Sequence, residues 1–221
     1  MPSRLKQRLI AEFIGTAVLT AVVVGSGILA SRLTHDTSLI VLLGTVATVP
    51  ALGVLIWVLV PISGAHFNPA VSLVMRLRGA VNNSTMVAYI AVQCAGAVFG
   101  AVIANLMYEL PALSISHTAR GGMGRFLGEV VATAGLLAIV CIVIDRGLSR
   151  FIPVAVPAWI ASASLFTSST AFANPAVTLG RVFSDSSPGI APSSAAAFAV
   201  AQFLGALIGV LVSRVSARSS I

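Results

Sequence analysis

Long apolar runs, separated by short polar or Gly/Pro-rich breaks, dominate the chain. Several of these runs reach or exceed about 20 residues, the length that a helix needs to cross the hydrocarbon core of a membrane. We therefore predict six membrane-spanning helices, with ends placed to within about 2 to 4 residues. The six predicted spans are Leu9–Ser31, Leu39–Val60, Met86–Tyr108, Met123–Ile144, Ile152–Leu165 and Ala195–Ser213.

Two further segments, Ile62–Arg78 and Thr167–Ser184, are moderately apolar but too short and too rich in Gly, Pro, Ser and Asn to cross a membrane. Each contains one Asn-Pro-Ala motif. Irregular backbone is tolerated at membrane depth only where it is buried in protein or lines a wet cavity, so both segments are predicted to be re-entrant loops. The motifs are Asn68-Pro69-Ala70 and Asn174-Pro175-Ala176.

An internal repeat relates the two halves of the chain. The run Arg8–Thr16 matches Arg125–Thr133 at an offset of 117, the two Asn-Pro-Ala motifs are 106 apart, and a Gln-x-x-Gly-x-x-x-Gly pattern recurs at an offset of 109. We predict one channel domain over residues 1–221, built from repeats at about 8–110 and 123–214. Because each repeat holds three spans, the two copies must be inverted, and their functional site is expected near the membrane midplane.

The Gln-x-x-Gly-x-x-x-Gly patterns predict close packing between helices, since small residues let two backbones approach. In the first half the pattern runs from Gln93 through Gly96 to Gly100, and in the second from Gln202 through Gly205 to Gly209.

The Asn-Pro-Ala motif has a direct structural meaning. Asn is a strong N-cap residue, and Pro is favoured at the first helical position, so each motif should start a helix. From Asn68 to about Arg78, and from Asn174 to about Ser184, the helix would rise roughly 15 Å, about half a crossing. Two such half-helices meeting at the centre would each contribute about +0.5 of positive charge there. This field repels cations, whereas a neutral solute can accept hydrogen bonds from the Asn amides.

Composition and charge narrow the function classes. The chain is 57% hydrophobic and only 9% charged, against about 25% charged residues in a typical soluble domain. Its net charge of +7 comes from scattered residues and not from a basic stripe, so we expect no nucleic-acid partner. By the positive-inside rule, nine of the thirteen Lys and Arg residues favour cytoplasmic termini. The nine are Arg4, Lys6, Arg8, Arg76, Arg78, Arg146, Arg150, Arg214 and Arg218, against Arg32, Arg120, Arg125 and Arg181 on the opposite side.

Three stretches carry a family resemblance: Ser63-Gly-Ala-His-Phe-Asn-Pro-Ala-Val71, Asn174-Pro-Ala-Val177 and Ala11-Glu12-Phe-Ile-Gly-Thr16. They resemble the aquaporin and aquaglyceroporin family, the major intrinsic proteins, and the resemblance covers essentially the whole chain. It implies an all-α membrane protein with six transmembrane helices and two re-entrant half-helices. It further implies a homotetramer in the lipid bilayer of the plasma membrane (the inner membrane of a bacterium). Its expected activity is passive flow of small neutral solutes, without a cofactor, a metal ion or enzymatic chemistry.

In that family four positions form the narrowest constriction, the selectivity filter. Counted without gaps from the two motif asparagines, they fall here on Thr48, Ser162, Ala171 and Val177. The last position normally holds Arg, so this chain departs from the family there. We predict a filter that is wider and less cationic than that of a strict water channel.

Two comparisons within the family bear on the solute. Glycerol facilitators carry Asp one residue after the filter Arg, and the matching residue here is Thr178. The stretches Phe166–Ala176 and Asp185–Pro192 are similar to bacterial members associated with arsenic resistance, which pass neutral metalloid acids. Water, glycerol and a neutral acid such as arsenous acid therefore remain candidate solutes.

Two basic side chains near the predicted pore each leave two interpretations open. Arg181 lies four residues after Val177, on the same helix face one turn outward. It either places the missing positive charge in the outer vestibule or is an interfacial Arg whose head reaches toward water. His66, two residues before Asn68, either lines the pore or packs as a structural residue.

Glu12 and Glu129 occupy equivalent points of the repeat, within the first and fourth predicted spans. A carboxylate inside a membrane is expensive unless it has partners, and such residues are functional candidates. One hypothesis is a proton-coupled secondary transporter that protonates this pair. The family resemblance implies instead that the two carboxylates accept hydrogen bonds from the re-entrant loops and anchor them.

Overall fold

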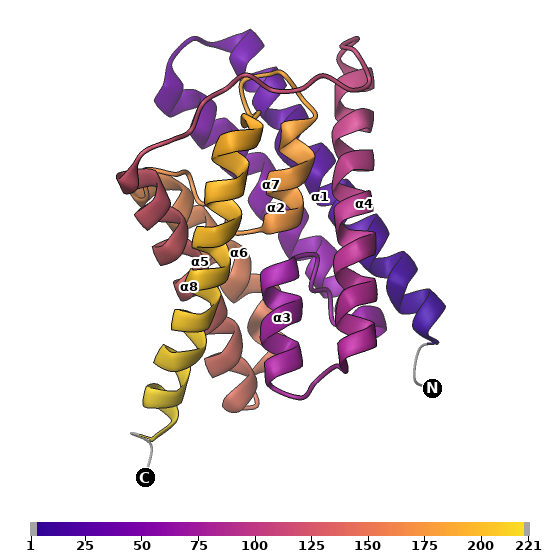
Figure 1. Cartoon of the computed structure of the whole chain (residues 1–221), viewed down its shortest axis with the longest axis vertical. Helices are drawn as coiled ribbons and strands as arrows, with labels where there is room; N and C mark the ends of the chain where they lie inside the picture. The colour runs from indigo at the N-terminus through magenta and orange to yellow at the C-terminus, as the bar shows by residue number, and fades with distance from the viewer. Residues whose placement is uncertain (1–3, 219–221) are drawn as a thin grey trace.

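The structure is a computed structural model that describes residues 4–218, with side chains as far as residue 215. Six long helices and two short ones follow one another along these residues, and the six long ones match the predicted spans (Figure 1). The long helices are α1 (Leu5–Leu33), α2 (Thr37–Ser63), α4 (Asn83–Met107), α5 (Met123–Asp145), α6 (Ile152–Phe166) and α8 (Pro192–Arg218). The short ones are α3 (Pro69–Leu77) and α7 (Pro175–Val182), and a single 3-10 turn, Ser149–Phe151, precedes α6.

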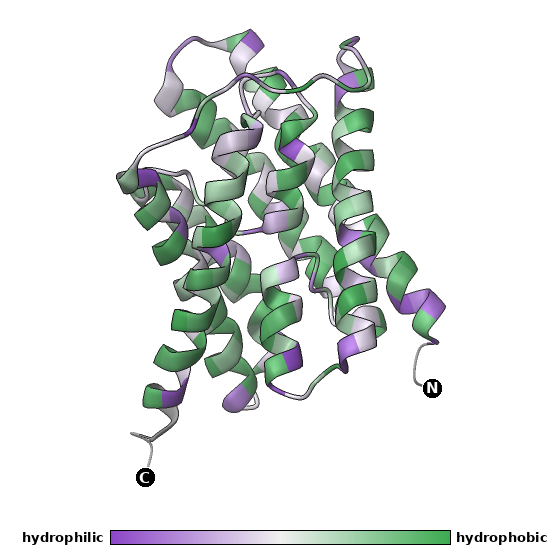
Figure 2. Cartoon of the chain, in the orientation of Figure 1, coloured by the Kyte–Doolittle hydropathy of each residue, from purple (hydrophilic) through white to green (hydrophobic). Residues whose placement is uncertain are grey.

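The two halves repeat the same order of elements: a long helix, a second long helix, a half-helix and a third long helix. In Figure 1, α3 and α7 lie in opposite halves of the molecule, and both start near its middle. The start of α1 and the end of α8 lie at the same end of the bundle. The six long helices are apolar along their length, and hydrophilic residues gather toward their ends (Figure 2).

Helix pairs α1 with α4 and α5 with α8 pack closely through glycines, as the Gln-x-x-Gly-x-x-x-Gly patterns predicted. A Cβ atom added to Gly96 would lie 2.5 Å from the carbonyl oxygen of Phe13, and one added to Gly100 would lie 2.1 Å from that of Ala17. In the second half, a Cβ atom added to Gly205 or to Gly209 would lie 2.4 or 2.5 Å, respectively, from the carbonyl oxygen of an α5 residue. The prediction of close packing is confirmed, because backbone touches backbone at all four glycines.

Gly100→Val is expected to lower the stability of the folded chain by about 3 kcal/mol, the upper end for an overpacked core. The obstacle is the backbone of α1, which cannot move aside as a flexible side chain can. Thermal unfolding of the detergent-solubilised protein measures the effect. Gly124→Ala is the matched control, since its added Cβ would meet only Ser168 at an ordinary 3.7 Å. Equal melting temperatures for Gly100→Val and the wild type would contradict the close contact.

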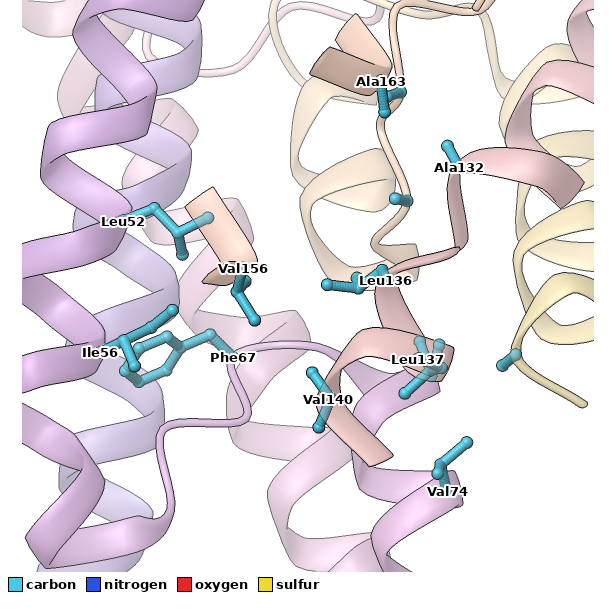
Figure 3. Close-up of a cluster of buried hydrophobic side chains, with 14 of the residues drawn as sticks. Leu52, Ile56, Phe67, Val74, Ala132, Leu136, Leu137, Val140, Val156 and Ala163 are labelled. Atoms are coloured by element: carbon cyan, nitrogen blue, oxygen red, sulfur yellow. The ribbon is translucent and has the colours of Figure 1, made fainter. Parts of the chain in front are cut away.

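The main apolar cluster lies between α2, α5, α6 and the two loops that precede the half-helices. Figure 3 shows side chains of this cluster reaching toward one another from separate helices, with Leu52 and Ile56 on α2, Leu136 and Val140 on α5, and Val156 on α6. Burial of this cluster holds α2 and α6 against the centre of the molecule. The side chains of the cluster also form part of the wall of the candidate site.

Candidate functional site

Both Asn-Pro-Ala motifs start a half-helix, as predicted. The side-chain Oδ1 of Asn68 accepts a hydrogen bond from the backbone N–H of Ala70 at 2.9 Å. Asn174 accepts from the N–H groups of Ala176 and Val177 at 3.0 and 3.2 Å. The helices run for nine and eight residues, ending at Leu77 and Val182.

The two motifs are also bonded to each other. The Asn68 side-chain N–H donates to the carbonyl oxygen of Ala173 at 2.7 Å, and the Asn174 side-chain N–H donates to the carbonyl oxygen of Phe67 at 2.8 Å. Each asparagine thus bonds the residue that precedes the other asparagine. A primary amide has two N–H groups, so each Asn keeps one for a solute.

Glu12 and Glu129 bond the loops that precede the motifs. Glu12 accepts hydrogen bonds from the backbone N–H groups of His66 and Phe67 at 2.9 and 2.7 Å. Glu129 accepts from the backbone N–H groups of Phe172 and Ala173 at 2.8 and 2.9 Å. Side-chain donors complete both sets: Ser63 and Gln93 at Glu12, and Gln202 at Glu129. Both carboxylates are fully buried and lie outside the cavity lining.

These loops hold an unusual backbone conformation. Ala65, Phe67, Thr170, Ala171 and Ala173 all have φ between 47° and 62°, in the left-handed region that L-residues rarely adopt. Such conformations persist only where the surroundings enforce them. The two buried carboxylates supply that enforcement, since each takes up two consecutive backbone N–H groups of the loop.

A cavity of about 770 Å³ runs past both motifs. Its wall includes Asn68, Asn174 and the two loops before them, together with one face each of α2, α5 and α6. On one stretch the wall is apolar, built by the side chains of Leu52, Ile56 and Leu136 (Figure 3). The cavity therefore has a largely apolar wall, with a few fixed polar groups at its centre.

Three of the four filter residues predicted from the sequence line this cavity, namely Thr48, Ala171 and Val177. Ser162 does not line it. Its side chain is exposed, and its hydroxyl donates to the carbonyl oxygen of Ala158 at 3.1 Å. The prediction for this position therefore has to be corrected.

Ser164, two residues further along α6, lines the cavity instead. The residues of α6 that line the cavity are spaced four apart: Ile152, Val156, Ile160 and Ser164. This spacing marks one helix face, and a residue two positions away points about 200° around the axis. The gapless count back from Asn174 therefore reached a residue on the opposite face of α6 from the one that lines the cavity.

His66 lines the cavity. Its ring Nδ1 lies 3.1 Å from the hydroxyl of Ser72, and the ring meets Tyr89 edge-on with centroids 5.2 Å apart. Two neighbouring side chains therefore hold the ring in place while it lines the cavity. The pore-lining and packing interpretations of His66 are compatible with each other.

Arg181 is buried on the cavity wall, with 8% of its surface exposed. Its guanidinium carbon lies 3.3 Å from the centre of the Phe172 ring, and its Nε donates to the carbonyl oxygen of Pro188. An interfacial arginine would instead extend its head group toward bulk water. The position of Arg181 fits the vestibule interpretation.

Sequence reasoning missed two residues of the outer cavity. Arg120 was counted only as a charge on one side of the membrane, and Phe172 was not singled out, yet both line the cavity. Arg120 lies in the segment between α4 and α5, which has few apolar residues. Nothing in the local sequence of this segment indicates that Arg120 folds back to the cavity. Among the described residues, no group of three or more His, Cys, Asp or Glu side chains is placed to hold a metal ion.

Comparison with known proteins agrees with this geometry. Residues 2–169 match the family described as Major intrinsic protein. The chain is 44% identical to the aquaglyceroporin AqpS of Rhizobium meliloti (strain 1021) over 95% of its own length and 90% of that protein. It is 33% identical to Aquaporin C of Dictyostelium discoideum over 81% of its length and 70% of that protein.

A solved structure shows the same fold. The X-ray structure of the aquaglyceroporin from Plasmodium falciparum superimposes with a TM-score of 0.72 at 20% identity, covering 96% of this chain and 95% of that one. The family match and the identity to AqpS place the chain among multi-pass membrane channels and not among enzymes. The protein therefore belongs to the major intrinsic protein family and is an aquaglyceroporin-type channel.

Proposed function

We propose that the chain conducts small neutral solutes passively through a filter that lacks the usual arginine. The filter residues are Thr48, Ser164, Ala171 and Val177. The observation that carries the proposal is Val177, which lines the cavity three residues after Asn174, where the family normally has Arg. The solutes are water, glycerol and neutral metalloid acids such as arsenous acid.

The physical basis is size and charge at the constriction. Val177 adds no positive charge and occupies less space than an arginine, so a solute wider than water passes. The hydroxyl oxygens of Thr48 and Ser164 can accept hydrogen bonds from the O–H groups of a polyol or a neutral acid, while the O–H of Ser164 itself donates to the carbonyl oxygen of Ile160. At the centre, the N-terminal ends of α3 and α7 and the two asparagines face the path, which favours oxygen atoms and disfavours cations.

Support for solutes larger than water also comes from similarity. The relative in Rhizobium meliloti carries the name aquaglyceroporin and covers nearly the whole chain. The stretches Phe166–Ala176 and Asp185–Pro192 extend the proposal to neutral metalloid acids.

The proton-coupled alternative requires Glu12 and Glu129 to exchange protons with a transported solute. Both carboxylates already accept three or more hydrogen bonds from loop backbone and neighbouring side chains. Neither lines the cavity. A group in this position has no open route to a solute, which favours the passive channel.

Proteoliposome swelling tests the function. Vesicles that contain the purified full chain are exposed to an osmotic gradient for water, or to a concentration gradient of glycerol, urea or arsenous acid. A pH-sensitive dye inside the vesicles reports proton leak. We expect flux of all small neutral solutes down their gradients, independent of an imposed pH difference. A protein that conducts water but none of the larger solutes would contradict the proposal of a wide filter. Solute uptake that follows the pH gradient would favour a transporter.

Arg181→Ala is expected to raise sodium or proton leak at least about threefold and to leave neutral-solute swelling within about twofold. The reason is that the variant removes a positive charge from the cavity wall without touching the narrowest residues. Vesicle conductance with a potential-sensitive dye measures the leak. Unchanged leak and solute selectivity would show that Arg181 has no role in the vestibule.

Orientation and assembly complete the proposal. The nine Lys and Arg residues counted on the side of the termini favour both termini in the cytoplasm of a plasma membrane, with the bacterial inner membrane as the expected site. The side chain of Arg218, one of the nine, lies outside the described part of the chain. The homotetramer and the inverted repeats at about 8–110 and 123–214 stay predictions from the sequence.

A further inference from the structure

Charge on the cavity wall is of one sign. The charged residues that line it are Arg8, Arg120, Arg125 and Arg181, and among the described residues no Asp or Glu lines it. Rings of Arg or Lys line pores that favour anions, whereas rings of Asp or Glu line pores that favour cations. The cavity wall therefore carries an excess of positive charge.

Two of these arginines converge on one aromatic ring. The guanidinium carbons of Arg120 and Arg181 lie 5.3 and 3.3 Å from the centre of the Phe172 ring. The Phe172 ring is itself fixed by an edge-on contact with Phe198, with centroids 5.1 Å apart. The two positive charges therefore share one small region of the outer vestibule.

Carbonyl oxygens of the loop after α7 hold both guanidinium groups. Arg120 donates from Nε to Gly189 and from Nη2 to Ser187, both at 2.8 Å. Arg181 donates from Nε to Pro188. Within the described part of the chain, the Nη1 group of Arg120 and both Nη groups of Arg181 have no hydrogen-bond partner. These groups are the donors left for a ligand.

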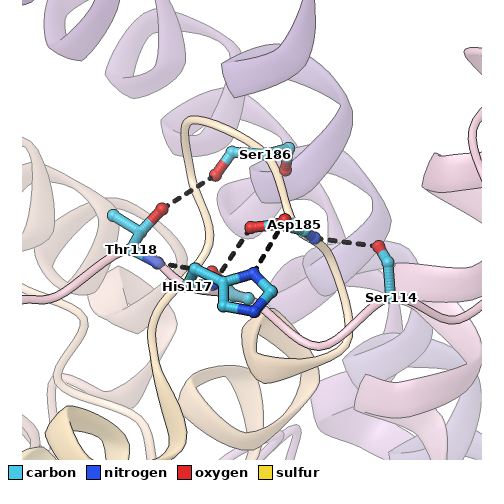
Figure 4. A network of polar contacts seen from close by, with 6 residues as sticks. Ser114, His117, Thr118, Asp185 and Ser186 are labelled. Carbon is cyan, nitrogen blue, oxygen red and sulfur yellow. Dashed lines mark hydrogen bonds and ion pairs between the residues drawn. The ribbon is translucent and has the colours of Figure 1, made fainter.

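Arg120 reaches the vestibule because the segment between α4 and α5 is fastened across the outer face. His117 bonds Asp185 through both its backbone N–H and its ring Nδ1, each at 3.0 Å, and Asp185 N–H donates to Ser114 (Figure 4). Backbone bonds from Ser116 to Val182 at 2.8 Å, and from Ala191 to Thr118 at 2.8 Å, continue the same attachment. The segment thus carries Arg120 to a fixed place beside Arg181.

Among the described residues, no carboxylate forms an ion pair with Arg120 or Arg181. Glu129 is the acidic group that lies near both arginines, but its oxygens are occupied by two loop N–H groups and Gln202. Asp185 is paired with His117 on the exposed side. Burial lowers the pKa of Arg120 to about 10, and the charge of Arg125 acts in the same direction. Glu129 offsets only one of the two positive charges, so a bound anion relieves the repulsion between two partly desolvated cations.

We propose that Arg120 and Arg181 form an anion-binding site in the outer vestibule that takes a small oxyanion, such as a carboxylate. Guanidinium groups bind carboxylates through paired N–H donors in a fixed geometry. The site adds an anion ligand to the neutral solutes of the proposed function, and an anion held there stands in the path of those solutes.

Calorimetric titration of the purified full chain with sodium acetate, at ionic strength held constant with sodium chloride, tests the site. Acetamide has a similar size and no charge, so it serves as the control ligand. We expect saturable acetate binding, no acetamide binding, and about tenfold weaker acetate binding in Arg120→Gln, the loss of one charge-assisted contact. Arg32→Gln is the matched control, since Arg32 lies in the outer part of the chain and does not line the cavity.

A second, more conservative variant shows whether weaker acetate binding in Arg120→Gln comes from misfolding. Arg120→Lys keeps the charge and loses the free Nη1 group, so we expect acetate binding weakened by about threefold. Equal acetate affinity in the wild type, Arg120→Gln and Arg120→Lys, or an equal response to acetamide, would overturn the proposal. Glycerol swelling is measured in the same preparations: its absence from the wild type contradicts the neutral-solute channel, whereas normal swelling with arginine-independent acetate binding contradicts only the anion site.

Discussion

Val177→Arg is expected to lower glycerol flux by about tenfold or more and to change water flux by less than about twofold. Val177 is 4% exposed in the first turn of α7 and lies on the cavity wall three residues after Asn174. An arginine there fills space that the valine leaves open and places a fixed positive charge at the constriction. A wide solute loses its passage, whereas water still fits.

Stopped-flow light scattering of proteoliposomes with glycerol, urea and water gradients measures this prediction. Val177→Met is the matched control, because methionine adds length without charge and separates the effect of volume from that of charge. The double variant Val177→Arg with Arg181→Val moves the charge by one helical turn and removes repulsion between neighbouring arginines. Glycerol flux that stays at the wild-type level in Val177→Arg would remove Val177 from the filter.

Glu129→Gln is expected to destabilise the folded channel by about 3 kcal/mol and to abolish flux of every solute. Both oxygens of Glu129 accept hydrogen bonds, from Phe172, Ala173 and Gln202. A glutamine has only one acceptor oxygen. Its NH₂ group replaces the second carboxylate oxygen and faces an N–H donor to which it cannot bond. The loop before Asn174 then loses the contact that holds its left-handed backbone.

Thermal unfolding in detergent and swelling of vesicles measure the two parts of this prediction. Glu12→Gln should behave in the same way, since it occupies the equivalent place in the first half, and the exposed Glu109→Gln is the control. A proton-coupled transporter predicts another pattern: a stable protein that still moves solute downhill but no longer responds to a pH gradient. That pattern would restore the transporter hypothesis.

Much of the architecture was predictable because it depends on local signals. Five of the six predicted spans are apolar runs of about 20 residues, the length that a membrane crossing requires, and the shorter run Ile152–Leu165 completes the repeat. Asn followed by Pro fixes the start of each half-helix, because one residue caps and the other fits the first turn. The glycines at positions 96, 100, 205 and 209 predicted close helix pairs, because a missing side chain can be read directly from the sequence.

The remainder depends on distances in space that no local pattern reports. The Ser162 prediction counted back from Asn174 without gaps, whereas the residue of α6 that lines the cavity there is Ser164, two positions further along. Arg120 reaches the cavity through contacts with residues 182–191, more than 60 positions away along the chain. The cross-bonds between Asn68 and Ala173, and between Asn174 and Phe67, connect residues 105 and 107 positions apart.

Those cross-bonds also set an order of assembly. While only the first half of the chain has entered the membrane, the side-chain N–H of Asn68 and the carbonyl oxygen of Phe67 lack the partners that the second half supplies. Unpaired polar groups in hydrocarbon cost several kcal/mol each. The first re-entrant loop therefore completes its hydrogen bonds only after the second loop has arrived.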